Sequence, residues 1–201
     1  MSVFKTILTG SEVELGVIDT LKEWMPTYLR ELELQLGRAE NKIPPPIMYT
    51  QTTEIEDINF DQLPTALVVS PGLAGTPMAD GEGTYRAPFV IGVAVICSAK
   101  DQETTKDLAK IYAAAVRAVL LQKRVPSLGS QVDWIDESYD DLPELDQRTM
   151  CAGYGLFSVW VDDLVSRVGG PLAPADPETQ PGSVWPTADD VLIETEMLEG
   201  G

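Results

Sequence analysis

The chain has 201 residues, of which 44% are hydrophobic, so it can form one domain of ordinary size with a buried core and an appendage. Its net charge of -18 argues against binding to nucleic-acid grooves or phosphates, which needs clustered Lys and Arg. The charge is compatible with a surface past which DNA slides, although solubility alone is the simpler explanation. No run approaches the roughly 20 apolar residues of a membrane span, and no signal-peptide pattern is visible, so we expect a protein made in the cytoplasm.

The N-terminal region predicts helix, interrupted once. Ser11 and Glu14 have the spacing of a capping box, and Gly37 is a natural stop. Apolar residues recur at three- and four-residue steps on more than one stripe, which suits a helix covered on two sides. Pro26 predicts a kink or a restart, and hence a pair of helices.

A strand and a long loop are predicted in the middle of the chain. Residues 44–46 are three prolines that form a stiff connector, and residues 47–53 contain a weak strand pattern. Residues 63–70 include a continuous apolar run typical of a strand buried on both faces. Residues 71–83 are rich in Gly and Pro and predict a mobile loop.

The clearest block runs from residue 85 to residue 168. Residues 85–97 predict a central strand that is apolar on both faces, and residues 101–122 predict a helix with Asp101 as its N-cap. Residues 131–139 and 148–161 predict an antiparallel pair of strands, joined by an acidic turn. Gly153 and Gly155 indicate a bulge or the close approach of a neighbouring backbone.

Together these elements predict an α/β (α+β) fold. We expect a mixed, mainly antiparallel sheet of about four to five strands, packed by an N-terminal helix pair and one long central helix. Residues 1–168 form this domain, and residues 169–201 form an extended, Pro-rich acidic arm. The arm should be disordered when free. Its apolar residues need something to bury them, so we expect it to dock on a neighbouring subunit through Trp185, Val191, Leu192 and Ile193.

No residue pattern indicates catalysis, a metal or a cofactor. The chain has no histidine, which removes His-based triads, most zinc sites and the usual general base near neutral pH. The acidic group at residues 136–146 does not have the spacing of a Ca²⁺ loop, and a solvated hairpin explains it better than a cation site or a pair of catalytic acids. We expect Cys97 and Cys151 to be small buried hydrophobic residues, although they could form a disulfide if their strands are neighbours.

The aromatic residues of the last two strands indicate a protein interface. Trp134, Tyr139, Tyr154 and Trp160 would stack on bases in an RNA-binding sheet, but their charged neighbours are Asp and Glu rather than Lys and Arg. Core or interface positions explain them better. We therefore take Trp134, Tyr139 and Tyr154 as candidate interface residues.

Over residues 12–168 the chain resembles the tail terminator proteins of long, non-contractile-tailed phages, the actinobacteriophage kind in particular. The stretches that carry the resemblance are 21–29 (LKEWMPTYL), 66–72 (ALVVSPG), 83–87 (GTYRA) with its apolar strand, 113–117 (AAAVR) and 132–139 (VDWIDESY). These are packing patterns rather than catalytic signatures. The chain differs from a minimal terminator in its long acidic C-terminal arm, which a minimal terminator lacks.

The resemblance implies a structural virion protein at the head–tail junction, and no enzyme. Such proteins form six-fold rings that stop tail-tube polymerisation and bind head-completion proteins, while double-stranded DNA passes through the lumen. The implied partners are copies of the chain, the tail tube protein and a head-completion or stopper protein, with no membrane. Acidic residues facing the channel would let DNA slide; the candidates are Asp140, Asp141, Glu144 and Asp146.

Three alternatives to a terminator remain open. The first alternative is another structural protein of the same tail. It would be a head–tail connector, such as a stopper or head-completion protein, or a tail tube subunit, which should polymerise without limit. A small carboxylate-dependent enzyme is the remote alternative, and it would need two converging acids in a deep pocket. A standalone binding module would be a stable monomer.

Overall fold

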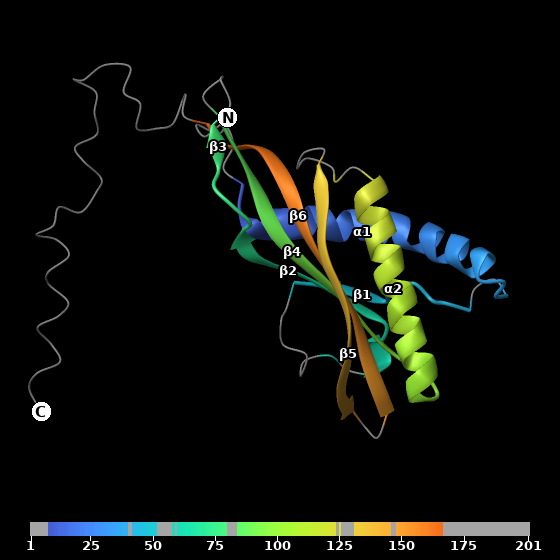
Figure 1. Cartoon of the computed structure of the whole chain (residues 1–201). Coiled ribbons are helices and arrows are strands. Elements are labelled where there is room, and N and C mark those ends of the chain that lie inside the picture. Colours follow the sequence, from blue (N-terminus) through green and yellow to red (C-terminus); the bar gives the residue numbers. More distant parts are fainter. Residues whose placement is uncertain are drawn as a thin grey trace, which may run out of the picture.

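The computed structural model describes residues 8–39, 42–51, 58, 60–79, 84–123, 125, 131–145 and 148–166. Within these residues it is an α+β fold with two helices and a six-stranded, mixed, mostly antiparallel sheet. The elements, shown in Figure 1, are α1 (Gly10–Gln35), β1 (Met48–Thr50), the 3-10 turn η2 (Phe60–Gln62), β2 (Thr65–Leu73), β3 (Met78–Ala79), β4 (Thr84–Ser98), α2 (Gln102–Gln122), β5 (Val132–Leu145) and β6 (Arg148–Ser166).

β4 lies inside the sheet and β5 forms one of its edges. The strand order is β1-β2-β4-β6-β5, and β3 pairs with the start of β4. β1 and β2 are parallel, and the other pairs are antiparallel. The predicted central strand and the predicted antiparallel pair at the end of the domain are therefore both confirmed.

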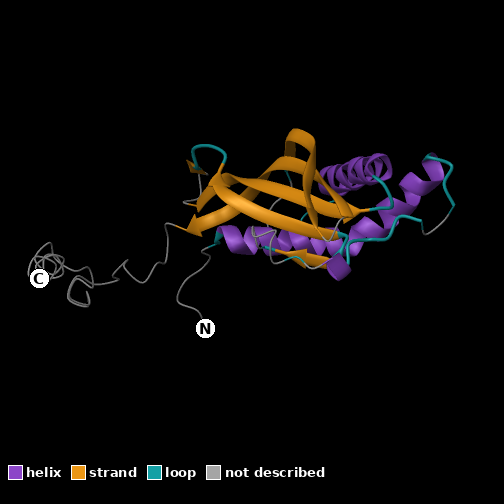
Figure 2. Ribbon diagram, turned by 90° about the horizontal axis from the view of Figure 1, so that it is seen from below, coloured by secondary structure: helices purple, strands orange, loops and turns teal. Residues whose placement is uncertain are grey.

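The two faces of the sheet are covered unequally. On one side, which we call the helix face, alternate strand residues pack with both helices in one continuous apolar cluster that includes Phe89, Ile91, Val93, Val95 and Phe157. The opposite side, the far face, has a smaller cluster around Ile96 and Met150. Val90 and Ala94 remain partly exposed there, so β4 is only partly covered on its second face. Figure 2 shows the curved sheet with α1 lying along it.

α1 is one continuous helix, and the prediction of an N-terminal helix pair is wrong. Pro26 lies inside α1, where it removes one helical hydrogen bond at a cost of about 3 kcal/mol. Its neighbours Leu21, Met25 and Leu29 are at most 1% exposed. Burying each such side chain contributes about 1.5–3 kcal/mol, so tertiary packing offsets the cost of the proline.

The capping box of α1 lies two residues earlier than predicted. The backbone N–H of Thr9 donates to Glu12 Oε2 at 2.7 Å, and the N–H of Glu12 donates to Thr9 Oγ1 at 3.4 Å. Ser11 therefore lies inside the helix rather than capping it. At the other end Gly37, with φ of 63°, follows the C-cap and confirms the predicted stop.

The strands extend further than the sequence predicts. β2 continues through Pro71 to Leu73 with a bulge between Val69 and Gly72, and β3 lies in the segment predicted as a loop. β5 continues to Leu145, so most of the predicted acidic turn is strand and only residues 146–147 separate β5 from β6. The acids of this segment consequently alternate between the two faces of the sheet.

α2 packs directly on the backbone of β6. Asp101 caps the helix, as predicted: its carboxylate accepts the N–H of Thr104 at 2.8 Å, and this hydrogen bond lowers the pKa of Asp101. A Cβ on Gly153 would lie 2.1 Å from the carbonyl oxygen of Ala109 in α2. Gly153 is therefore required for close approach, as predicted. This packing fixes α2 beside the edge strand β5.

Candidate interface on the edge strand

β5 presents different chemistry on its two faces. The residues opposite Val159, Phe157, Gly155, Gly153 and Cys151 of β6 lie on the helix face; they are Val132, Trp134, Glu137, Tyr139 and Asp141. The residues between them lie on the far face and include Asp133, Asp136, Ser138 and Asp140. A bulge between Trp134 and Asp136 leaves Ile135 without a partner in the ladder.

On the helix face, cations of α2 neutralise the acids of β5. Arg117 Nη1 donates to Glu137 Oε2 at 2.5 Å, and its guanidinium lies 4.8 Å from the centre of the Trp134 ring. Lys106 Nζ donates to Asp141 at 3.0 Å. This hydrogen bond lowers the pKa of Asp141 and raises the pKa of Lys106. Both contacts hold the edge strand against α2.

Three exposed large apolar residues lie along β5, and we refer to them together as the patch. Trp134, Ile135 and Tyr139 are 48%, 52% and 37% exposed. Trp134 Nε1 donates to the carbonyl oxygen of Asp136 at 3.0 Å, and the Tyr139 hydroxyl donates to Glu137, which raises the pKa of Tyr139. The two rings are thus held in place before any partner arrives, which lowers the entropy cost of binding.

On the far face, β5 carries a row of acids without cationic partners. Asp133, Asp136 and Asp140 form no ion pair with any residue that the structure describes. Asp133 accepts the indole N–H of Trp160 at 3.0 Å. The guanidinium of Arg86 lies 4.5 Å from the centre of the Trp160 ring and 3.6 Å from Asp162. This face therefore combines negative charge with half-buried aromatic rings.

The four aromatic residues singled out by the sequence do not form one group. Trp134 and Tyr139 lie on the helix face at the edge, whereas Tyr154 and Trp160 lie on the far face. Tyr154 leans over Gly92: its hydroxyl oxygen lies 2.8 Å from the position that a Cβ on Gly92 would take. Burial raises the pKa of Tyr154.

The candidate channel acids are also divided. Asp140 lies on the far face, and Asp141 lies on the helix face in contact with Lys106. Glu144 belongs to β5, but its side chain is outside the described part of the structure, as is Asp146. The candidate interface residues of the arm are outside it too; they are Trp185, Val191, Leu192 and Ile193.

Two buried carboxylates were missed by sequence reasoning. Glu14 accepts the N–H of Ser70 at 2.6 Å and a hydrogen bond from Gln51 at 2.7 Å, and Glu33 accepts the N–H of Ile43 at 2.6 Å. They tie α1 to the segments beside it, and they lie about 28 Å apart along the helix, at 1.5 Å per residue. The sequence does contain a signal for Glu33, because this residue continues the four-residue series of buried positions at 13, 17, 21, 25 and 29.

The two cysteines occupy opposite positions on β4 and β6. Cys97 pairs in register with Cys151, and both are free and 1% exposed. Burial raises the pKa of the Cys97 thiol to about 12 and that of Cys151 to about 11. Their prediction as small buried residues is confirmed.

Comparisons with known proteins add no family assignment. No family model matches the chain, and no curated protein matches it significantly. In the described part of the structure, neither helix is long and apolar enough to cross a membrane. No group of His, Cys, Asp and Glu among the described residues is arranged to hold a metal ion.

Proposed function

We propose that this chain is the subunit of a ring-forming tail terminator of a long, non-contractile-tailed phage. The ring caps the tail tube, binds the head-completion or stopper protein at the head–tail junction, and lets double-stranded DNA pass through its lumen. The sequence resemblance motivates this proposal. The observation that carries it is the chemistry of β5, a long edge strand that is equipped for contact yet protected against open-ended pairing.

An unprotected edge strand is a template for unlimited strand addition, which would produce a fibre. β5 has two irregularities, at Trp134–Asp136 and at Leu142–Leu145, and its 14 residues include six acids and no cation. Bulges and repeated charge both oppose strand addition. The exposed patch of Trp134, Ile135 and Tyr139 still offers a side-chain contact. This combination favours a closed assembly over a polymer such as a tail tube.

The far-face acids suit a surface that faces DNA. Asp133, Asp136 and Asp140 form no ion pair with the described residues, so no contact cation neutralises them. Such a surface repels phosphates and prevents the adhesion that Lys and Arg would produce. Asp141 does not contribute in the same way because Lys106 neutralises it. Asp133, Asp136 and Asp140 are therefore the proposed channel acids.

The assembly is tested by size-exclusion chromatography with light scattering, and by electron microscopy. Six copies of the 21.9 kDa chain have a mass of about 131 kDa. Ile135→Lys replaces an exposed apolar residue of the patch with a charge and should shift the protein to smaller species without changing its fold. Leu15→Lys is the matched control, because Leu15 is similarly exposed, at 48%, but lies on α1. It should leave the ring intact.

Other outcomes would assign other functions. Long polymers of the purified chain would indicate a tube subunit, and a monodisperse monomer at high concentration would indicate a binding module. If Leu15→Lys broke the assembly and Ile135→Lys did not, β5 would not be the contact surface.

The channel surface is tested separately, with fluorescent double-stranded DNA at low salt. The wild-type ring should not bind it, whereas Asp136→Lys with Asp140→Lys should retain it, with an affinity that falls steeply as salt is added. If the wild type and the double variant retained DNA equally, these acids would not face the lumen.

A further inference from the structure

Three adjoining hollows surround the N-terminal half of α2. The first is lined by Arg38, Thr104 and Lys110 among others, and the second, of about 320 Å³, shares Arg38 and Thr104 with it. A third hollow shares Ser98 and Ala99 with the second. The three hollows share these lining residues, and we call them together the α2 basin.

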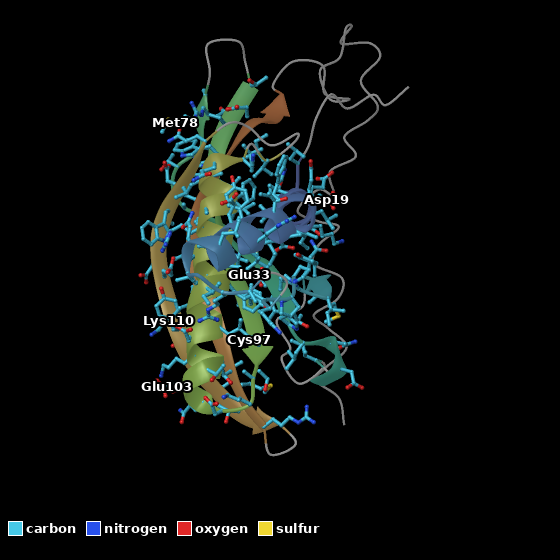
Figure 3. The ribbon with its side chains drawn as sticks, turned by 90° about the vertical axis from the view of Figure 1, so that its right-hand side faces the viewer. Asp19, Glu33, Met78, Cys97, Glu103 and Lys110 are labelled. Atoms are coloured by element: carbon cyan, nitrogen blue, oxygen red, sulfur yellow. The ribbon has the colours of Figure 1, made fainter. Side chains whose placement is uncertain are left out.

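The α2 basin is cationic in a strongly acidic protein. Six of the chain's 14 Lys and Arg residues line it, and they are Arg38, Lys42, Lys100, Lys106, Lys110 and Arg148. Among the described lining residues the acids are Glu103 and Asp107, and three of the cations, Arg38, Lys100 and Lys106, pair with Asp107, Asp101 and Asp141. Figure 3 shows Glu103 and Lys110 along α2. Lys42 and Lys110 are exposed and form no ion pair with the described residues, so their charge is available to a partner.

The basin also has an apolar floor. The 320 Å³ hollow is lined by Ile43, Pro44, Leu63, Pro64 and Leu108. The pairing of cations with apolar walls fits a flexible ligand that carries both carboxylates and aliphatic side chains. It fits a DNA duplex poorly, because the rigid phosphate backbone has no apolar groups that could enter the hollow.

We propose that the α2 basin binds the acidic C-terminal segment of a second copy of this chain, residues 189–199. This inference rests on the self-association proposed above. The sequence of the segment is DDVLIETEMLE, which alternates carboxylates with aliphatic residues. From residue 169 to the end the chain has seven acids and no Lys or Arg. Opposite charge therefore attracts the segment to the basin, whereas the six acids of β5 repel it.

Geometry favours the basin of a neighbour over the chain's own. Ser166, where β6 ends, pairs with Thr84 at the start of β4, and the basin lies beyond Ser98 at the other end of β4. At about 3.3 Å per residue, β4 spans about 46 Å. The linker of roughly 23 residues from 167 to 189 contains five prolines, so it is extended and reaches about 70 Å at about 3.1 Å per residue. β6 runs away from the basin, so docking in the same chain would require this stiff linker to turn back along the domain, which docking on a neighbouring subunit avoids.

The experiment uses carbodiimide, which joins amines and carboxylates that are in direct contact. Full-length protein labelled with ¹⁵N is mixed with unlabelled protein, dissociated, reassembled, cross-linked and analysed by mass spectrometry. We expect links from Lys42 or Lys110 to residues 189–199 in mixed-isotope pairs. Because Lys42→Glu with Lys110→Glu removes those two amines, its effect is scored on the links from Lys100 and Lys106, which should fall at least five-fold, whereas Lys22→Glu on α1, outside the basin, should not change them.

A charge reversal on both sides provides the rescue. Glu194→Lys with Glu196→Lys, combined with the basin reversal, should restore the links in the opposite sense, from arm lysines to basin carboxylates. Three results would each overturn the proposal. They are links confined to single-isotope pairs, a link yield that basin reversal leaves unchanged, and a basin variant that loses DNA binding but keeps its arm links. Light scattering on the same samples distinguishes this failure from that of the ring, because an intact assembly without arm links contradicts only the docking inference.

Discussion

Gly153→Ala should separate α2 from the sheet, and the magnitude follows from the structure. The added methyl group would lie 2.1 Å from the carbonyl oxygen of Ala109 and 3.3 Å from the Cβ of Ala113. The first contact is far inside van der Waals distance, and it is made with a backbone carbonyl that α2 holds in place. α2 would have to retreat by about 1 Å, which weakens the dispersion contacts across the interface by a quarter to a half.

The expected cost is at the upper end of the range for overpacked cores, about 3 kcal/mol. For a domain of this size that corresponds to a decrease in melting temperature of about 6–12 °C. Urea unfolding followed by circular dichroism, at fixed protein concentration, measures the change in the free energy of unfolding. Gly75→Ala is the control, because its Cβ would meet only Pro88, at 3.9 Å, and it should change stability by less than about 0.5 kcal/mol.

A second variant tests the cause of the loss. Ala113→Gly removes the side-chain contact at 3.3 Å but leaves the clash with the Ala109 carbonyl. Added to Gly153→Ala it should give no rescue, and should cost about a further 1 kcal/mol through its helix propensity. If the double variant were as stable as the wild type, or if Gly153→Ala alone were neutral, the close approach of the two backbones would be refuted.

Two further predictions concern buried groups. Because burial raises the pKa of Cys97 to about 12 and of Cys151 to about 11, both thiols remain protonated at pH 8, and iodoacetamide should label the native protein at least 100-fold more slowly than the urea-unfolded chain. Because both folded pKa values lie above those of the unfolded chain, the thiols' contribution to stability is present below pH 9 and is lost as the pH rises toward the folded values. The urea midpoint should therefore fall between pH 9 and 11. Rapid labelling of the native protein, or a urea midpoint that does not change with pH, would contradict this. Glu33→Ala leaves the buried N–H of Ile43 without its acceptor and should cost about 1–3 kcal/mol in urea unfolding, whereas the exposed Glu31→Ala should cost less than about 0.5.

Local periodicity was sufficient to predict β4 and α2. Their apolar residues repeat with the period of a strand and of a helix, and the cap at Asp101 marks where α2 begins. It was not sufficient for α1, since the penalty of Pro26 is local but the packing of Met25 and Leu29 that offsets it is tertiary. A local rule that is outweighed by distant contacts gives the wrong number of helices.

The extent of β5 was mispredicted for a similar reason. Consecutive acids indicate a turn when they are read alone, because carboxylates are poor strand formers. In the structure Glu137 and Asp141 are compensated by Arg117 and Lys106, which lie about three turns apart on α2. No pattern within β5 reveals those partners. The candidate interface was therefore predictable in its composition, but the division of its aromatic and acidic residues between two faces required the register of the sheet.

The distribution of charge also limits how copies of the chain can meet. α2 supplies cations to the helix face of β5, whereas Asp133, Asp136 and Asp140 on the far face have no cationic partner among the described residues. A two-fold contact that placed two far faces together would oppose these acids to their own copies and would be repulsive. A contact that includes the far face must therefore join it to an unlike surface, and a repeated contact between unlike surfaces either closes into a ring or continues as a filament. The bulges and charges of β5 oppose continuation, and this is why we favour closure.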